Sequence, residues 1–212
     1  MSDFEVSEPI LNLPFEEPKE HWWIIEGEPL ERRSGRRPAM YYYLEPGRDQ
    51  VERAGYHIAS AYTAVKDPSR APFVYRDRLW QGADLVGLGV ASFGHVNGVH
   101  MQNADTWDAY CAAVERGEIP LSRAYRPTDE ERMIRELVLQ LKLGSIRPAY
   151  FRAKYGTDIL ERFRESFASL SADGYLAAAD EDRVTLSRQG LLCIDGLLPR
   201  FFLPEHVGIR YT

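Results

Sequence analysis

Between Asp84 and Ser92 the sequence reads Leu85-Val86-Gly87-Leu88-Gly89-Val90, a continuous apolar run. Such a run, without alternating polar residues, is typical of a strand that is covered on both faces, as in a parallel sheet. Gly87 and Gly89 have no side chain, which allows close approach of another backbone or of a ligand. The run therefore predicts a buried strand, and a turn-prone stretch follows it at residues 93–100.

The sequence before this run divides into two parts. Residues 51–84 contain a predicted short strand at Gly55–Ala59 and a proline-containing loop. Residues 1–50 are acidic as far as Glu31, then carry a cluster of arginines at 32, 33, 36 and 37, and contain prolines at 9, 14, 18, 29, 38 and 46. Proline at this density prevents a long helix. We expect an extended, proline-rich acidic arm over residues 1–50, with one short strand at Trp22–Ile25.

The arm contains one basic cluster and one aromatic run, and each allows two interpretations. The arginines at 32, 33, 36 and 37 could contact phosphate, or they could form a solvated charge cluster. The run Tyr41–Tyr43 could stack on bases, or it could form a half-buried strand, since aromatic residues favour strands. The residues alone leave both questions open.

The sequence after residue 104 is mainly helical. Asp105 is the expected cap of a helix that Gly117 ends, and Thr128 with Glu131 forms a capping box for the next. Further helices are expected to begin at Pro148 and at Thr157 or Asp158. The expected inward-facing residues of this region are Ile134, Leu137, Val138, Leu141, Leu160, Phe163, Phe167 and Leu170.

The end of the chain predicts a hairpin and a last helix. Tyr175–Ala178 and Arg183–Leu186 can pair across the acidic turn of residues 180–182, and Ser187 can cap the helix that follows. Two helices, a hairpin and a helix outline a winged-helix-like end. The predicted fold class is α+β, with partial barrel-wall strands followed by a mainly helical domain.

Composition limits the function classes. The 212 residues carry a net charge of -6, which argues against a general nucleic-acid partner. No apolar run is long enough to span a membrane and no secretory signal is visible, so we expect a soluble cytoplasmic protein without membrane association. The two cysteines, Cys111 and Cys193, lie in apolar helical patterns and are expected to be buried free thiols.

A resemblance to a known family rests on a series of segments. They are Trp80–Val90, Ala91–His95, Asn97–Val99, Gln102–Asn103, Glu130–Arg132, Ile134–Glu136, Leu139–Lys142, Leu186–Ser187, Gly190–Leu192 and Phe201–Phe202. In this order they resemble the C-terminal part of oxygen-independent coproporphyrinogen III oxidase-like radical SAM proteins, over residues 51–212. The resemblance divides this part into a remnant of the radical SAM barrel edge at 51–103 and a helical C-terminal domain at 104–212.

The resemblance implies an oxidoreductase of tetrapyrrole and haem metabolism. In the family, a 4Fe-4S cluster on a Cys-x-x-x-Cys-x-x-Cys motif cleaves S-adenosylmethionine, and coproporphyrinogen III is oxidatively decarboxylated. Gly87, Gly89 and Phe93 match the loop beside S-adenosylmethionine and become candidate contacts. Since the chain has only two cysteines, we expect no cofactor on this chain alone, no catalytic residue of its own and no metal site.

A second resemblance concerns the arm. The segments Pro9–Asn12, Pro14–Pro18, His21–Trp22, Glu26–Pro29 and Gly35–Ala39 resemble the N-terminus of type III restriction endonuclease-like proteins. No phosphate-binding loop of the Gly-x-x-x-x-Gly-Lys-Ser/Thr type is present, so ATP hydrolysis is not expected. This resemblance would make the chain a fusion of two fragments, joined near residues 48–51.

Three functional hypotheses follow. The chain is a catalytically incomplete member of the coproporphyrinogen oxidase-like family, or a noncatalytic module that binds haem or porphyrin or docks on a partner, or a remnant of a restriction system. His95 and His100 could be haem or metal ligands, but their i, i+5 spacing is not that of a helical metal pair, and local hydrogen bonding is the alternative. A strand at Leu85–Val90 without neighbours predicts self-association through an exposed edge or pairing with the arm.

Overall fold

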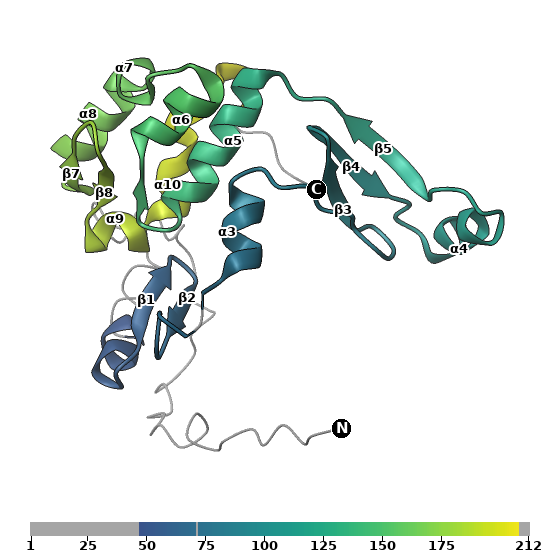
Figure 1. The fold of residues 1–212 in the computed structure, drawn as a ribbon, viewed down its shortest axis with the longest axis horizontal. Helices are drawn as coiled ribbons and strands as arrows, with labels where there is room; N and C mark the ends of the chain where they lie inside the picture. Colours follow the sequence, from purple (N-terminus) through teal and green to yellow (C-terminus); the bar gives the residue numbers. More distant parts are fainter. Residues whose placement is uncertain (1–46, 71, 208–212) are drawn as a thin grey trace, which may run out of the picture. The chain divides into compact units, whose positions relative to one another are not determined.

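The computed structural model describes residues 47–70 and 72–207, all of which belong to one unit of the chain, Tyr43–Thr212. The strand predicted at Trp22–Ile25, and nearly all of the arm, lie outside the described residues. Helices and strands alternate along the described chain, and three separate sheets of two or three strands form (Figure 1). The coarse prediction of a mixed α+β fold is confirmed.

The first sheet is a short hairpin. Residues 47–53 are helical, and the antiparallel strands β1 (His57–Ser60) and β2 (Thr63–Val65) follow, close to the strand predicted at Gly55–Ala59. The amide of Ala61 donates to the carbonyl of Lys142 at 2.8 Å, and the Tyr62 hydroxyl donates to Asp195 at 2.5 Å. These contacts attach the hairpin to the helical part of the chain. Helix α3 (Val74–Trp80) leads on to the glycine-rich run.

The second sheet begins in the stretch of residues 93–100, which the sequence marked as turn-prone. Strands β3 (Phe93–Val96) and β4 (Val99–Asn103) pair around Asn97 and Gly98, whose φ angles are 49° and 76°. Positive φ at both central residues is the turn geometry that Asn-Gly favours in two-residue hairpins. Strand β5 (Leu121–Tyr125) pairs with β4, so the strand order is β3-β4-β5.

The prediction that Leu85–Val90 is a strand covered on both faces was wrong. Only Leu85 makes a bridge, to His95, and the side chains of Val86 and Leu88 are 68% and 83% exposed. The run turns away from an extended path because Gly89 has a φ of 101°. Among the described strands, only β3 lies beside it, so one side of the run has no partner strand.

Helix α4 (Trp107–Glu115) connects β4 to β5. Thr106, not Asp105, is its N-cap residue, because the backbone becomes helical only after Thr106. Gly117 follows its end with a φ of 73°, as expected. Cys111, which was expected to be buried, is partly exposed to solvent. The buried residue of this helix is Ala113. Trp107 is largely exposed.

The helical part begins with α5 (Asp129–Leu141), where the predicted capping box is confirmed: the Thr128 side chain accepts from the amide of Glu131, and the Glu131 carboxylate accepts from the amide of Thr128. Helix α6 (Pro148–Tyr155) ends at Gly156, whose φ is 68°. The next predicted helix is broken at Phe163 into α7 (Ile159–Arg162) and α8 (Arg164–Ala172). Ile159 is fully buried, whereas the predicted Leu160 is only partly buried.

The third sheet completes this part. Strands β7 (Leu176–Ala179) and β8 (Val184–Leu186) form the predicted hairpin, and β6 (Ser145–Ile146) adds to β8, which gives the order β6-β8-β7. Ser187 caps α9 (Arg188–Leu192), and α10 (Ile194–Leu197), η2 (Leu198–Phe201) and η3 (Pro204–His206) follow (Figure 1). The core is here, with the least exposed large side chains at Leu137, Leu141, Ile146, Phe151, Ile159, Leu170, Val184, Ile194 and Phe201.

Candidate ligand-binding face

The glycine-rich run packs against β3 through its backbone. Leu85 and His95 exchange two backbone hydrogen bonds, at 2.6 and 2.7 Å. The buried side-chain amide of Asn103 donates to the carbonyls of Gly87 and Gly89 at 2.9 and 3.0 Å. A Cβ atom at Gly87 would lie 2.2 Å from the carbonyl oxygen of Phe93. The structure therefore brings the three candidate residues Gly87, Gly89 and Phe93 together.

The packing of the run explains why positions 87 and 89 are glycines. Gly87 has no room for a side chain because the β3 backbone is too close, and Gly89 has a positive φ that favours glycine. Of the two possibilities that the sequence left open, close approach of another backbone accounts for Gly87. Phe93 differs from both glycines, because its side chain is 50% exposed and available to a ligand.

The register of β3, β4 and β5 places a set of rings and polar groups on one face of the sheet. Phe93 is opposite Gln102, which is opposite Arg123, and His95 is opposite His100, which is opposite Tyr125. Directly opposed residues and residues two apart share a face. We define the aromatic face by these six residues: Phe93, His95, His100, Gln102, Arg123 and Tyr125.

Contacts between the side chains agree with this register. The rings of Phe93 and His100 lie 5.5 Å apart, with planes parallel to within 12°. The rings of His95 and His100 are 6.4 Å apart. The Arg123 guanidinium donates to the Gln102 side-chain oxygen at 2.6 Å. The part of the aromatic face near Phe93 and Arg123 is the open part, since His95 is buried.

The surroundings of His95 and His100 lower the pKa values of both imidazoles. Burial lowers the pKa of His100 below its ordinary value, and Arg135 and Arg123 lower it further. Burial also lowers the pKa of His95, with Arg135 and His100 acting in the same direction. Both imidazoles are therefore neutral near pH 7. Their Nδ1 atoms are buried and have no hydrogen-bond partner among the described residues.

A hydrogen-bond cluster fixes the end of β5. The Tyr125 hydroxyl donates to Glu131 at 2.5 Å, and His206 Nε2 lies 2.8 Å from the same carboxylate oxygen. The other Glu131 oxygen accepts from the Thr128 amide at 2.7 Å. The hydrogen bond from Tyr125, followed by that from Thr128, lowers the pKa of Glu131 to about 2. Tyr125 is therefore held in one orientation at the edge of the aromatic face.

A buried carboxylate lies beside His95. Glu136, only 3% exposed, accepts from the Tyr150 hydroxyl at 2.6 Å and pairs with Lys154 at 2.7 Å. Burial, followed by Glu136, raises the pKa values of Tyr150 and Tyr155. A cavity of about 280 Å³ adjoins this group. Because Glu136 is already paired and hydrogen-bonded, we assign it a structural role, in which it holds α3, α5 and α6 together.

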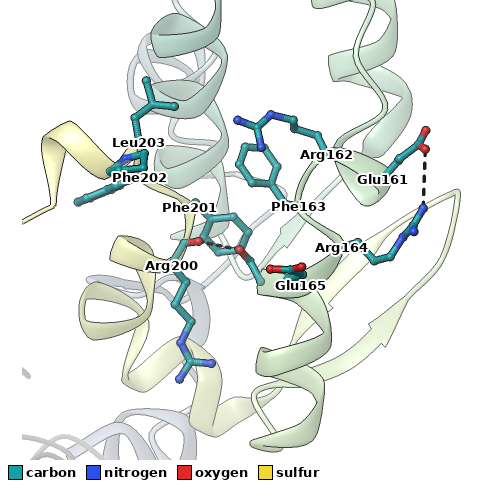
Figure 2. Close-up of a pocket in the computed structure, with 11 residues that line it drawn as sticks. Glu161, Arg162, Phe163, Arg164, Glu165, Arg200, Phe201, Phe202 and Leu203 are labelled. Atoms are coloured by element: carbon teal, nitrogen blue, oxygen red, sulfur yellow. Dashed lines mark hydrogen bonds and ion pairs between the residues drawn. The ribbon is translucent and has the colours of Figure 1, made fainter.

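A larger cavity, of about 640 Å³, lies between the start of α8 and η2 (Figure 2). Its three arginines are already paired: Arg162 with Glu130, Arg164 with Glu161 and Arg200 with Asp173. Phe163 and Phe201 form part of its wall and belong to the core. The three guanidinium groups of this cavity are therefore engaged within the protein.

Metal-ligating side chains do not converge in residues 47–70 and 72–207, where no group of three or more His, Cys, Asp or Glu could hold an ion. Cys111 lies on α4 and Cys193 follows α9, and neither is in a disulfide. In the same residues, no helix has the length and apolarity needed to cross a bilayer.

Comparisons with known proteins give one informative result. No protein-family model matches the chain, and no curated protein does. Among solved structures, coproporphyrinogen III oxidase from Escherichia coli, described as a radical SAM enzyme, superposes with a TM-score of 0.61 at 18% sequence identity. The chain has the fold of part of that enzyme. The match covers 74% of this chain and 39% of that one, less than two thirds of its length.

The comparison supports the first predicted resemblance at the level of fold. None of the comparisons supports the second, between residues 1–48 and type III restriction endonuclease-like proteins. Sequence reasoning missed the aromatic face because it treated residues 93–100 as a turn. The dipeptide Asn97-Gly98 between Val96 and Val99 was the available signal, since it favours a tight hairpin and thereby pairs His95 with His100.

Proposed function

We propose that this chain is the C-terminal portion of an oxygen-independent coproporphyrinogen III oxidase-like radical SAM protein, with a role in tetrapyrrole and haem metabolism. The observation that carries the proposal is the fold shared with the Escherichia coli enzyme over 74% of the chain. At 18% identity this supports a shared fold. The step from fold to activity rests on the family resemblance of residues 80–142 and 186–202.

Alone, the chain is proposed to be catalytically incomplete. An iron–sulfur cubane of this kind requires three converging thiolates, and the sequence has two cysteines. They lie on separate elements, α4 and the end of α9, so the residues present do not fit a cluster. Radical generation would have to be supplied by another polypeptide or another part of the same protein.

Gly87, Gly89 and Phe93 are proposed as the contact with S-adenosylmethionine. The exposed side chain of Phe93 is the available part of this contact, since the glycines are engaged with the chain's own backbone. The end of the chain, where two helices, the β7–β8 hairpin and helix α9 make up the predicted winged-helix-like outline, is proposed as a docking piece or lid. Its hairpin turn is acidic at Asp180, Glu181 and Asp182, which disfavours contact with phosphates.

A second candidate function is a noncatalytic module that binds haem or porphyrin or docks on a partner. The exposed side chains of Val86, Leu88 and Trp107 favour it, since exposed apolar patches mark interaction sites. Self-association through the side of Leu85–Val90 that has no partner among the described strands is a further form of this proposal. A nucleic-acid role of the restriction type lacks support from the comparisons.

Anoxic iron–sulfur reconstitution of the whole chain, followed by an assay for S-adenosylmethionine cleavage, tests the main proposal. We expect no cluster absorbance and no 5′-deoxyadenosine, while coproporphyrinogen III oxidase from Escherichia coli, treated identically, serves as the positive control. Formation of 5′-deoxyadenosine by this chain alone would overturn the proposal. Titration with haem and calorimetry with S-adenosylmethionine then separate the two candidates. Binding of haem without binding of S-adenosylmethionine favours the noncatalytic module.

A further inference from the structure

The glycine-rich run has an inner edge that is hydrogen-bonded to the protein. Leu85 exchanges backbone hydrogen bonds with His95. The carbonyls of Gly87 and Gly89 accept from the side chain of Asn103. The groups that point inward therefore belong to every second residue. In an extended chain, the backbone groups of the residues in between point to the opposite edge.

This outer edge is formed by Val86 and Leu88. Among the described residues, the backbone N–H and C=O of Val86 have no hydrogen-bond partner. The carbonyl of Leu88 accepts from the Ser92 hydroxyl at 2.7 Å and keeps a second lone pair. The side chains of Val86 and Leu88 share one face and are 68% and 83% exposed. An exposed apolar edge with unpaired backbone groups is a template for another strand.

The sequence of this edge is complementary to itself when a second copy runs antiparallel. With a two-fold axis at Gly87, Val86 of one copy lies opposite Leu88 of the other, and symmetry repeats the same apolar pair. Each pair can exchange two backbone hydrogen bonds, while glycine faces glycine at the axis and permits close approach. No charged residue lies between 85 and 90, and each Asp84 would be opposite Val90. Like charges are therefore kept apart.

We propose that a second copy of this chain pairs antiparallel with the outer edge of Leu85–Val90, about a two-fold axis at Gly87. This inference rests on the proposed function in its second form, a noncatalytic docking module, and it names the partner as the chain itself. The symmetry favours a second copy over an unrelated extended peptide, because each favourable contact is made twice.

Helix α4 adds apolar surface beside this edge. The Tyr110 hydroxyl accepts from the amide of Gly89 at 3.0 Å. Trp107, three residues earlier on the same helix face, is 70% exposed. Because the paired edge is short, we expect a weak dimer with a dissociation constant in the micromolar range.

Sedimentation equilibrium of the full chain, from about 10 µM to 1 mM, measures this association. We expect a monomer–dimer equilibrium in which Leu88→Lys raises the dissociation constant about tenfold or more, because lysine removes the apolar contact with Val86 in both pairs and adds two like charges. Ile119→Lys is the matched control, since Ile119 is 80% exposed and lies outside the edge. It should leave the dissociation constant unchanged.

A charge pair tests the register. Val86→Glu alone should weaken the dimer, whereas Val86→Glu combined with Leu88→Lys should bring the dissociation constant back toward the wild-type value. The two substituted side chains have opposite charges and face each other twice across the axis, so restoration requires the antiparallel register about Gly87. Urea unfolding of each variant verifies that the fold is intact.

A chain that stays monomeric at every concentration would overturn the inference. So would equal dissociation constants for Leu88→Lys and Ile119→Lys, or a combined variant that associates no better than Leu88→Lys alone. The proposed function is judged separately by the haem titration and the 5′-deoxyadenosine assay, so its failure and the failure of this interface are distinguishable.

Discussion

Replacing Gly87 by alanine tests whether the glycine-rich run is held against β3 by its backbone. The added Cβ would lie 2.2 Å from the Phe93 carbonyl oxygen and 2.8 Å from its carbonyl carbon, whereas ordinary contacts begin at 3.4 Å. The run and β3 must therefore separate by about 1.2 Å, the difference between 3.4 and 2.2 Å. The obstacle is backbone, which a change of side-chain rotamer cannot remove.

Two routes give a similar size for the effect. Overpacking of this kind typically costs about 1–3 kcal/mol. If the run instead detaches, the two backbone hydrogen bonds between Leu85 and His95 are lost, at about 1 kcal/mol each. For a chain of this size a loss of 1 kcal/mol lowers the melting temperature by roughly 2–4 °C. We therefore expect Gly87→Ala to melt several degrees below the wild type.

Urea unfolding and hydrogen exchange measure the two consequences separately. The amides of Leu85 and His95 should lose protection in Gly87→Ala, since each donates to the other residue's carbonyl. Gly196→Ala is the matched control, because no atom lies within 4 Å of its added Cβ and it is in helix α10. If Gly87→Ala has wild-type stability and protection, the run is not packed on β3 and the steric argument is refuted.

Two further predictions concern the helical part. Leu137→Ala, at a fully buried position of α5, should lower the free energy of unfolding by about 2–5 kcal/mol in urea titrations, whereas the exposed Leu88→Ala should change it by less than about 0.5 kcal/mol; equal effects would contradict the assigned core. The folded-state pKa of Glu131, about 2, is below its ordinary value of 4.5, so its contribution to stability is complete above pH 4.5 and is lost as the pH falls toward 2. Glu131→Gln should flatten the pH dependence of the urea midpoint between pH 4.5 and 2, and the exposed Glu165→Gln should not; an unchanged slope in Glu131→Gln would count against the cluster.

Local signals in the sequence were sufficient for many elements. Thr128 and Glu131 fix the start of α5, Gly156 and Gly174 end α6 and α8, and Ser187 starts α9, because a cap or a positive φ depends on a few neighbouring residues. The stripe of α5 predicted Ile134, Leu137 and Leu141 as buried. The pattern failed at Leu85–Val90, where an apolar composition does not say whether a second layer exists to cover it.

The sequence by itself determined where most helices and turns form and which face of α5 enters the core. Only the tertiary structure decided that Phe93, His100 and Arg123 share a face, because this depends on the register of three strands and on the connection of 17 residues, including helix α4, between β4 and β5. The same holds for Glu136, a charged residue that is buried because Tyr150 and Lys154 come from another helix to pair with it. Contacts between residues distant in the chain follow from packing, and single-sequence periodicity does not encode the partner of a side chain.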